Sequence, residues 1–463
     1  MAAPFKSMVL RSILGIFALG ALGYAILVLA NLKDRDPSGE IAMLESMLER
    51  SSPVASEDNS YIYMLGIEGP PDSNPMALGL ERYEWMETAR PEFSTDDDPL
   101  GIGYDFESKR SEAVALLAKT CSESESECLA LLESDEETVE QWLTDERWLL
   151  DRYRTLIALP VFRESVPFDV FAPLPSYNVI LQGQRLHILD AWTAAGAGDA
   201  ARVSATLDRD LTYWRMVLEN SDALITKMIA TAAIIRHFKL GNLVLRRLPQ
   251  DVADDAIPPS WRAELTESER SMQRSLAGEW KYFDDLMKKT VTDMENPFDD
   301  WTGLADTTTW ERIKWVVLKP MWQPQDLTNR YARMMLDLGN AFDVPYEDIP
   351  NAVDIAEELQ ASAFKPFSRL YNFAGDLAMF TDGWSLSSYA VRVSDLEGIR
   401  RAALLVAELR ADGVTANDVV QRMLVSEIVH PYTNEPFAWD DSGVMVFKGL
   451  EPHEDRSRHE LIY

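Results

Sequence analysis

The fold of this chain depends most on residues 223–245, whose sequence is ALITKMIATAAIIRHFKLGNLVL. This segment is apolar on most faces of a helix, and a helix of that kind is buried at the centre of a protein. Asn220, Ser221 and Asp222 precede the segment and supply a cap for its first turn. We therefore expect a central helix here, with other helices packed around it.

Two more helices are predicted before this segment. The first runs from about Tyr177 to Ala195 and ends at the turn Gly196-Ala197-Gly198-Asp199. The second is amphipathic, because apolar residues recur in it at three- and four-residue steps: Val203, Leu207, Leu211, Trp214 and Leu218. The pair resembles one tetratricopeptide-type hairpin, but no regular repeat period runs through the chain. The predicted fold is therefore all-α, an irregular array of helical hairpins.

The end of the chain has a different pattern. A helix over residues 395–411 is stopped by Gly413, and a shorter helix begins near Asn417. The stretch HPYTNEPFAW at 430–439 is then followed by the turn DDSG and by Val444–Phe447, which predicts a small β-hairpin. We expect the residues after the hairpin to form a frayed tail.

The chain has two cysteines, Cys121 and Cys128, within the segment KTCSESESECLALL. Serine and glutamate alternate between them, so we expect a solvated loop there with a helix on each side. A disulfide would clasp this helical hairpin at its tip, as is normal in an oxidising compartment. Two thiols alone do not complete a tetrahedral metal site, and the sequence predicts no metal and no cofactor.

The segment SILGIFALGALGYAILVLANL at 12–32 has no charged residue and is long enough to cross a bilayer as one helix. We expect a transmembrane anchor here. The alternative is a cleaved signal peptide, since Val28-Leu29-Ala30 fits a cleavage site. Lys6 and Arg11 favour a cytoplasmic location for the head of the chain. The predicted regions are a cytoplasmic tail at 1–11, the anchor at 12–32, an irregular proline-rich region with short helices at 33–110, the helical array at 111–390, and C-terminal helices with the β-hairpin and tail at 391–463.

The chain is strongly acidic, with 76 aspartate and glutamate residues against 44 lysine and arginine residues and a net charge of −32. Nucleic acid is excluded as a partner, because its phosphate backbone attracts positively charged surfaces. Peripheral adhesion to anionic lipid is disfavoured for the same reason. We therefore expect the membrane contact to be made through the N-terminal helix.

Five segments together carry a resemblance to known sequences. They are the anchor, NSYIYMLGIEGPP at 59–71, the two-cysteine hairpin, LITKMIA at 224–230 and the HPYTNEPFAW stretch. In these segments the chain is similar to membrane-anchored proteobacterial proteins of uncharacterised function. The resemblance implies no activity. Together with the anchor, it leads us to expect a single-pass protein of the bacterial inner membrane with its body in the periplasm.

The common catalytic motifs are absent from the sequence, which has no Walker A loop, no G-x-S-x-G elbow and no H-E-x-x-H. The polar group that stands out is Lys227 on the apolar central helix, with Arg236 and His237 nine and ten residues further on. A buried lysine serves catalysis in some proteins. In others its amine pairs with a carboxylate or extends to water. These three residues form the candidate polar site.

We expect the exported body to be a binding or scaffolding module with a protein partner in the cell envelope, since a helical array without a catalytic motif suits that role. The alternative is a cell-envelope enzyme, a hydrolase or lyase that acts on cell-wall material with carboxylates that the sequence does not single out. A pocket with two facing buried acids would favour the enzyme. An extended groove or an apolar patch would favour the module.

Overall fold

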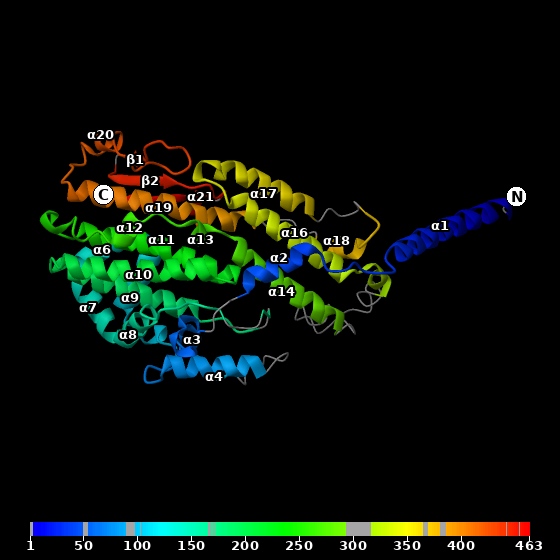
Figure 1. The fold of residues 1–463 in the computed structure, drawn as a ribbon, viewed down its shortest axis with the longest axis horizontal. Coiled ribbons are helices and arrows are strands. Elements are labelled where there is room, and N and C mark those ends of the chain that lie inside the picture. Colours follow the sequence, from blue (N-terminus) through cyan, green and yellow to red (C-terminus); the bar gives the residue numbers. More distant parts are fainter. Residues whose placement is uncertain are drawn as a thin grey trace.

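The predicted central helix is present as α11, Leu224–Arg246, and it lies in the middle of the body (Figure 1). The two predicted helices before it are α9, Tyr177–Gly196, and α10, Ala200–Asn220. Gly198 in the turn between them has φ +72°, a conformation that glycine adopts without strain. All three helices pack against one another, so the prediction of helices around the apolar segment is confirmed.

The computed structural model describes residues 3–49, 54–88, 98–101, 103–164, 168–169, 172–292, 316–363, 369–379, 386–440, 442–452 and 454–463. The helices before α9 are α1 Ala3–Ala30, α2 Gly39–Leu48, α3 Ser60–Leu65, α4 Pro75–Thr88, α5 Glu112–Glu123, α6 Glu125–Ser134, α7 Glu136–Asp145 and α8 Arg147–Leu156. Those after α11 are α12 Pro259–Arg262, α13 Glu267–Arg270, α14 Gln273–Thr292, α16 Pro324–Phe342, α17 Ile349–Ala363, α18 Phe373–Met379, α19 Ser387–Ala411, α20 Val419–Met423 and α21 Glu454–Ser457.

Short 3₁₀ turns and one small sheet complete the described elements. The 3₁₀ turns are η1 Ser56–Asp58, η3 Glu107–Lys109, η4 Gln250–Val252, η5 Lys319–Met321 and η6 Tyr346–Asp348. The strands are β1 Ala438–Asp440, β2 Val444–Lys448 and β3 Arg458–Ile462.

The helices form layers on both sides of α11. On one side, contacts run from α11 through α9 and α8 to α3 and α4. On the other side, α11 packs on α19, and α19 packs on the sheet. A second group, in which α2, α14, α16 and α17 contact one another, extends the body towards α1 (Figure 1). The protein is mostly helical, as predicted, and α11 joins its parts.

The C-terminal sheet has three antiparallel strands in the order β1-β2-β3. The predicted hairpin is therefore confirmed as β1 and β2, but the expectation of a frayed tail is wrong. The tail forms β3, in which His459 pairs with Phe447 of β2 and is buried. Gly398 allows α19 to approach this sheet, because a Cβ at that position would lie 2.1 Å from the Phe447 ring.

The two cysteines are joined by a disulfide between α5 and α6. The predicted solvated loop between them is wrong, because only Ser124 separates the two helices. The Ser124 side chain caps α6 by accepting a hydrogen bond from the Glu127 amide, at 3.4 Å. A serine at this position therefore starts a new helix, and the acidic residues that follow suit its first turn.

Helix α1 projects from one end of the body, opposite the end that holds the C-terminus (Figure 1). Its last turn is joined to the body through the buried Asn31. The Asn31 side chain donates to the Leu370 carbonyl at 3.0 Å and accepts from the Asn372 amide at 2.6 Å. Gln323 donates to the Asn31 carbonyl at 2.7 Å. These bonds hold the base of α1 on the body.

Candidate functional site

Lys227 lies in the first turn of α11 and is 2% exposed. Its Nζ donates to the carbonyl oxygens of Leu218, at 2.8 Å, and of Glu269, at 3.0 Å. Leu218 belongs to the last turn of α10, so the lysine satisfies a carbonyl that has no partner within its own helix. Burial lowers the pKa of Lys227 to about 7, because an apolar environment disfavours the charged ammonium. These contacts give the lysine a structural role.

His237 is fully buried on the side of α11 that faces α10 and α12. Its Nε2 accepts a hydrogen bond from the Trp261 indole N–H at 2.7 Å, so the ring hydrogen is assigned to Nδ1. Nδ1 then donates to Asp210 of α10 at 2.7 Å. An aspartate that orients a histidine in this way is typical of catalytic triads, but in those the second ring nitrogen faces the nucleophile. Here Trp261 occupies that nitrogen, and His237 is not available as a base.

Asp210 collects two further hydrogen bonds from other helices. It accepts from the Tyr153 hydroxyl of α8 and from the Gln184 amide of α9, the latter at 3.1 Å. We call the residues joined in this way the Asp210 network: Tyr153, Gln184, Asp210, Trp214, His237 and Trp261. All of them are buried. Although burial raises the pKa of Asp210, the hydrogen bond and charge interaction with His237 bring it below its usual value. The network is closed and joins four helices.

Arg236 precedes His237 on α11 but points to a different side of the helix, into a cavity of about 440 Å³. We call this cavity the basic pocket. Its walls come from η3, α5, α9 and α11, and four of its lining side chains are cationic. The lining residues are Glu107, Arg110, Ala115, Ala118, Lys119, Ser122, Asn178, Leu181, Gln182, Arg185 and Arg236.

The positive charges of the basic pocket are only partly neutralised. Arg110 is paired with Glu146 at 2.5 Å and lies 3.7 Å from Glu107. Arg236 donates only to the Leu181 carbonyl, at 3.2 Å, among the residues that the structure describes. Arg185 has no ion pair in the same part of the chain. Two of the four cations are therefore without a counter-ion there.

Arg185 is the most buried of the four, with 3% of its surface exposed. One Nη donates to Gln182 at 2.8 Å, and its buried Nε has no hydrogen-bond partner in the described part of the protein. Burial and the nearby positive charges of Arg236 and Arg110 lower the pKa of Arg185 to about 9. Burial also lowers the pKa of Arg236. The pocket is thus a concentration of positive charge that the fold itself does not balance.

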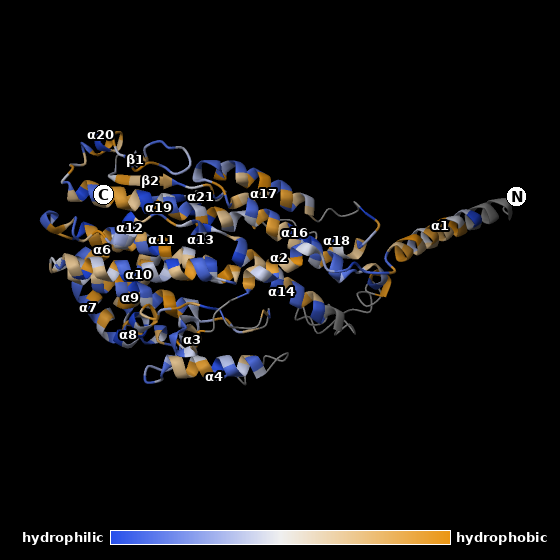
Figure 2. Ribbon diagram, in the orientation of Figure 1, coloured by the Kyte–Doolittle hydropathy of each residue, from blue (hydrophilic) through white to orange (hydrophobic). Residues whose placement is uncertain are grey.

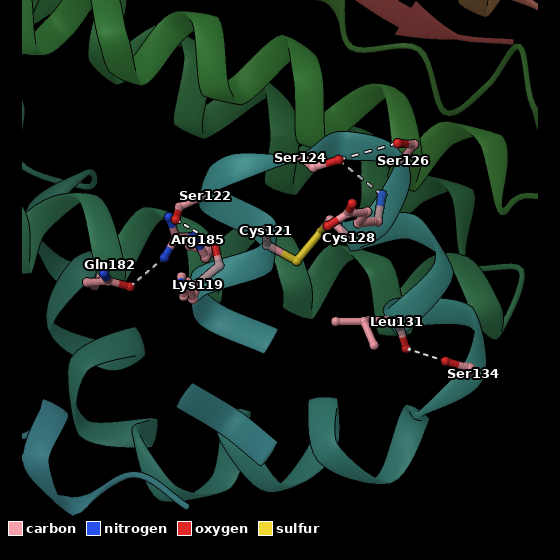
Figure 3. Close-up of a disulfide and its surroundings, with 11 residues drawn as sticks. Lys119, Cys121, Ser122, Ser124, Ser126, Cys128, Leu131, Ser134, Gln182 and Arg185 are labelled. Carbon is pink, nitrogen blue, oxygen red and sulfur yellow. Dashed lines mark hydrogen bonds between the residues drawn. A yellow bond between two sulfur atoms is a disulfide. The ribbon is translucent and has the colours of Figure 1, made fainter. Parts of the chain in front are cut away.

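The disulfide stands directly beside this pocket. Figure 3 shows Cys121 on α5 between Lys119 and Ser122, with Gln182 and Arg185 of α9 facing that part of the helix. The partner cysteine, Cys128, is buried on α6. The disulfide therefore fixes the helix that forms one wall of the pocket.

Two buried acids approach each other at the start of α11. Glu164 accepts hydrogen bonds from the backbone amides of Asp222 and Ala223 and from the Thr226 hydroxyl. Burial, followed by the negative charge of Asp222, raises the pKa of Glu164 to about 7. Asp222 itself pairs with Arg274 at 2.5 Å. Neither acid lines a cavity found among the described residues, so the pair caps a helix and does not form the accessible pair that the enzyme hypothesis needs.

The three residues of the candidate polar site are therefore not brought together. Lys227 caps α10, His237 belongs to the Asp210 network, and Arg236 lines the basic pocket. Sequence reasoning missed Arg185, although a signal existed, because this arginine interrupts the apolar pattern of α9 as Lys227 interrupts that of α11. Within the described residues there is no group of three or more His, Cys, Asp or Glu side chains that could hold a metal ion.

No protein-family model, no curated protein and no solved structure matches this chain. The functional argument therefore comes from the two sites described above and from α1.

Proposed function

We propose that this protein is a single-span membrane protein whose helical body is a binding module on the extracytoplasmic side. One observation carries the proposal. Two helices, Arg11–Ala30 within α1 and α11 as a whole, have the length and apolar composition of a membrane span, but they lie in opposite surroundings. The window in α11 is 67% buried in the body, whereas that in α1 is 0% buried. An apolar surface of this size needs a cover, and a bilayer fits its length.

The end of the body next to α1 supports the same proposal. Figure 2 shows hydrophobic residues along α1 where it leaves the body. Tyr24 donates from its hydroxyl to the Val317 carbonyl at 3.2 Å, which brings this part of the body alongside the helix. Large apolar side chains are exposed in the same region: Val316, Val317, Leu370 and Leu377. Such residues suit contact with the interfacial layer of a membrane.

The side of the membrane follows from the cysteines. A disulfide persists in an oxidising compartment, and here it joins α5 to α6 in the body. The basic residues of the N-terminal head agree with a cytoplasmic tail. In a bacterium this topology places the body in the periplasm and the span in the inner membrane.

Binding is favoured over catalysis because of where the polar groups lie. The Asp210 network is enclosed, and the Glu164–Asp222 pair faces no cavity of the described residues. The basic pocket is open, polar and lined by side chains with unused hydrogen-bond donors. A concave site with a few convergent polar groups is typical of ligand binding.

The test is a C-terminal alkaline phosphatase fusion combined with membrane fractionation, with a C-terminal fluorescent protein that folds only in the cytoplasm as the matched reporter. We expect phosphatase activity in the membrane pellet and no fluorescence. Phosphatase activity in the soluble fraction would mean cleavage near Ala30 and would contradict the anchor. Fluorescence without phosphatase activity would contradict the orientation.

A further inference from the structure

We propose that the basic pocket binds a small hydrophilic anion through its phosphate or carboxylate group, with Arg185 and Arg236 as the residues that bind the oxyanion. This proposal deepens the proposed function, because it names the ligand class of the binding module, and it rests on that function only for where the ligand is met. The pocket itself is tested without a membrane.

The state of Arg185 is the first argument. A guanidinium has five N–H donors and a permanent charge, and burying such a group without partners is unfavourable. Arg185 is 3% exposed, yet Gln182 is its single hydrogen-bond partner among the described residues, and its Nε has none. A bound oxyanion would accept the remaining hydrogen bonds and neutralise the charge. The planar fork of arginine matches phosphate and carboxylate oxygens.

The second argument is the pairing of charges around the pocket. In a chain with 76 acidic and 44 basic residues, counter-ions for arginine are abundant. Elsewhere arginines are paired, as Arg110 is with Glu146 and Arg215 is with Glu269. Arg185 and Arg236 instead face the same cavity, close enough that each positive charge disfavours the other. An anion between them would turn this repulsion into attraction.

The size and lining of the pocket limit the ligand. A cavity of about 440 Å³ holds a small molecule and not a folded partner. Ser122, Asn178 and Gln182 add neutral hydrogen-bonding groups, and Lys119 adds an exposed cation. The ligand class is therefore a compact polar anion, such as a phosphorylated metabolite or a dicarboxylate.

The strong negative charge of the whole protein makes the test clean. At net −32, non-specific attraction of small anions to the surface is opposed by the field of the protein. Saturable binding of an anion must therefore come from a local cluster of cations.

The experiment is isothermal titration calorimetry on the full-length chain in non-ionic detergent at low ionic strength. One arm uses inorganic phosphate and the other uses succinate, with sodium chloride as the reference titrant. We expect saturable binding of one molecule per chain in at least one arm. Binding of phosphate alone assigns a phosphorylated ligand, binding of succinate alone assigns a carboxylate, and binding of both supports a general oxyanion site.

Arg185→Gln and Arg236→Gln each remove one guanidinium, and we expect each to weaken binding by about tenfold or more. Two variants are used so that a folding defect in one does not decide the result. Arg422→Gln is the matched control, because Arg422 lies on α20, is exposed, pairs with Asp412 and does not line the pocket. The control should bind like the unchanged protein.

The proposal is overturned if neither anion binds saturably, or if both pocket variants, folded by circular dichroism, bind as tightly as the control. A failure of this kind leaves the phosphatase fusion result untouched. Conversely, a wrong topology would leave the titration unchanged, so the two proposals fail separately.

Discussion

Helices α9 and α11 each place neighbouring residues in two contrasting environments. Gln184 and His237 point into the Asp210 network, whereas the adjacent Arg185 and Arg236 point into the basic pocket. Successive residues of an α-helix are about 100° apart around its axis, so one helix pair can serve both regions. In the network every donor meets an acceptor, chiefly the carboxylate of Asp210. In the pocket two guanidinium groups meet none among the described residues.

This difference separates stabilisation from binding. A buried polar network that is fully satisfied rigidifies a core and fixes the arrangement of its helices. Polar groups that are buried and unsatisfied destabilise the free protein, and they persist where a ligand completes them. We therefore expect changes in the two regions to have opposite consequences for the free energy of unfolding and for anion binding.

The largest effect is expected for Asp210→Ala. This change leaves the Tyr153 hydroxyl, the Gln184 amide and His237 Nδ1 without their shared acceptor in the core. Each unsatisfied buried donor costs about 1–3 kcal/mol, so the free energy of unfolding should fall by about 4 kcal/mol. Chemical denaturation followed by circular dichroism measures this fall. A loss under about 1 kcal/mol would show that the network does not stabilise the body.

The next effect concerns Lys227 and depends on pH. Its pKa is about 7 in the folded protein against an ordinary value of 10.5. Below about pH 7 the lysine is protonated in both states, and the penalty for burying its charge is complete. Between about pH 7 and 10.5 the folded state releases the proton while the unfolded state keeps it. Stability should therefore rise with pH across this window, by on the order of 3 kcal/mol.

The control for this prediction is Lys227→Met, which has no titrating group at this position. Denaturation midpoints measured from pH 6 to 10 should rise less steeply in the variant than in the unchanged protein. Parallel curves would contradict the assignment. Because Lys227 touches neither the basic pocket nor the Asp210 carboxylate, the variant should bind phosphate and succinate as the unchanged protein does.

A smaller effect is expected when the wall of the basic pocket is released. Replacing both Cys121 and Cys128 by serine opens a loop of seven residues, and loop-closure entropy for that length is about 2 kcal/mol. The free energy of unfolding should fall by that amount. Anion affinity should also fall, because α5 carries Lys119 and Ser122 to the pocket. Replacing Cys128 and Cys121 with full retention of affinity would show that the wall holds its position without the disulfide.

The smallest change in stability is expected for Arg185→Gln, and its sign should be opposite to that of Asp210→Ala. Removing a buried charge without a counter-ion should leave the free energy of unfolding unchanged or raise it by about 1 kcal/mol, measured without added anion. A loss above about 2 kcal/mol would mean that Arg185 stabilises the fold and would remove the contrast between the two regions.

The comparison also explains how far the sequence could lead. The apolar period of α9, α10 and α11 is a local property, and their positions were predictable to within a few residues. The grouping of Lys227, Arg236 and His237 was not reliable, because proximity along a helix does not decide which neighbour each side chain meets. Asp210 lies on an amphipathic helix with no unusual local pattern. Its importance comes from donors on three other helices.

Two further differences have local causes that are visible afterwards. The alternating serines and glutamates between the cysteines suggested a loop, but Ser124 acts as a helix cap and the acids suit the first turn of α6. The last residues looked polar and unstructured, but alternation of buried and exposed side chains in β3 covers the outer edge of β2. In both cases a short pattern had two meanings, and the packing of neighbouring elements decided between them.

The central claim is that one helix pair stabilises the body through Asp210 and binds an anion through Arg185 and Arg236. The most direct test is chemical denaturation of the full-length protein in detergent, with and without phosphate or succinate, for the unchanged protein, Asp210→Ala and the double variant Arg185→Gln/Arg236→Gln. A ligand that binds the folded state raises its stability in proportion to its occupancy. We predict an equal rise for the first two proteins, despite the lower starting stability of Asp210→Ala, and none for the double variant. An equal rise in all three, or in none, would contradict the claim.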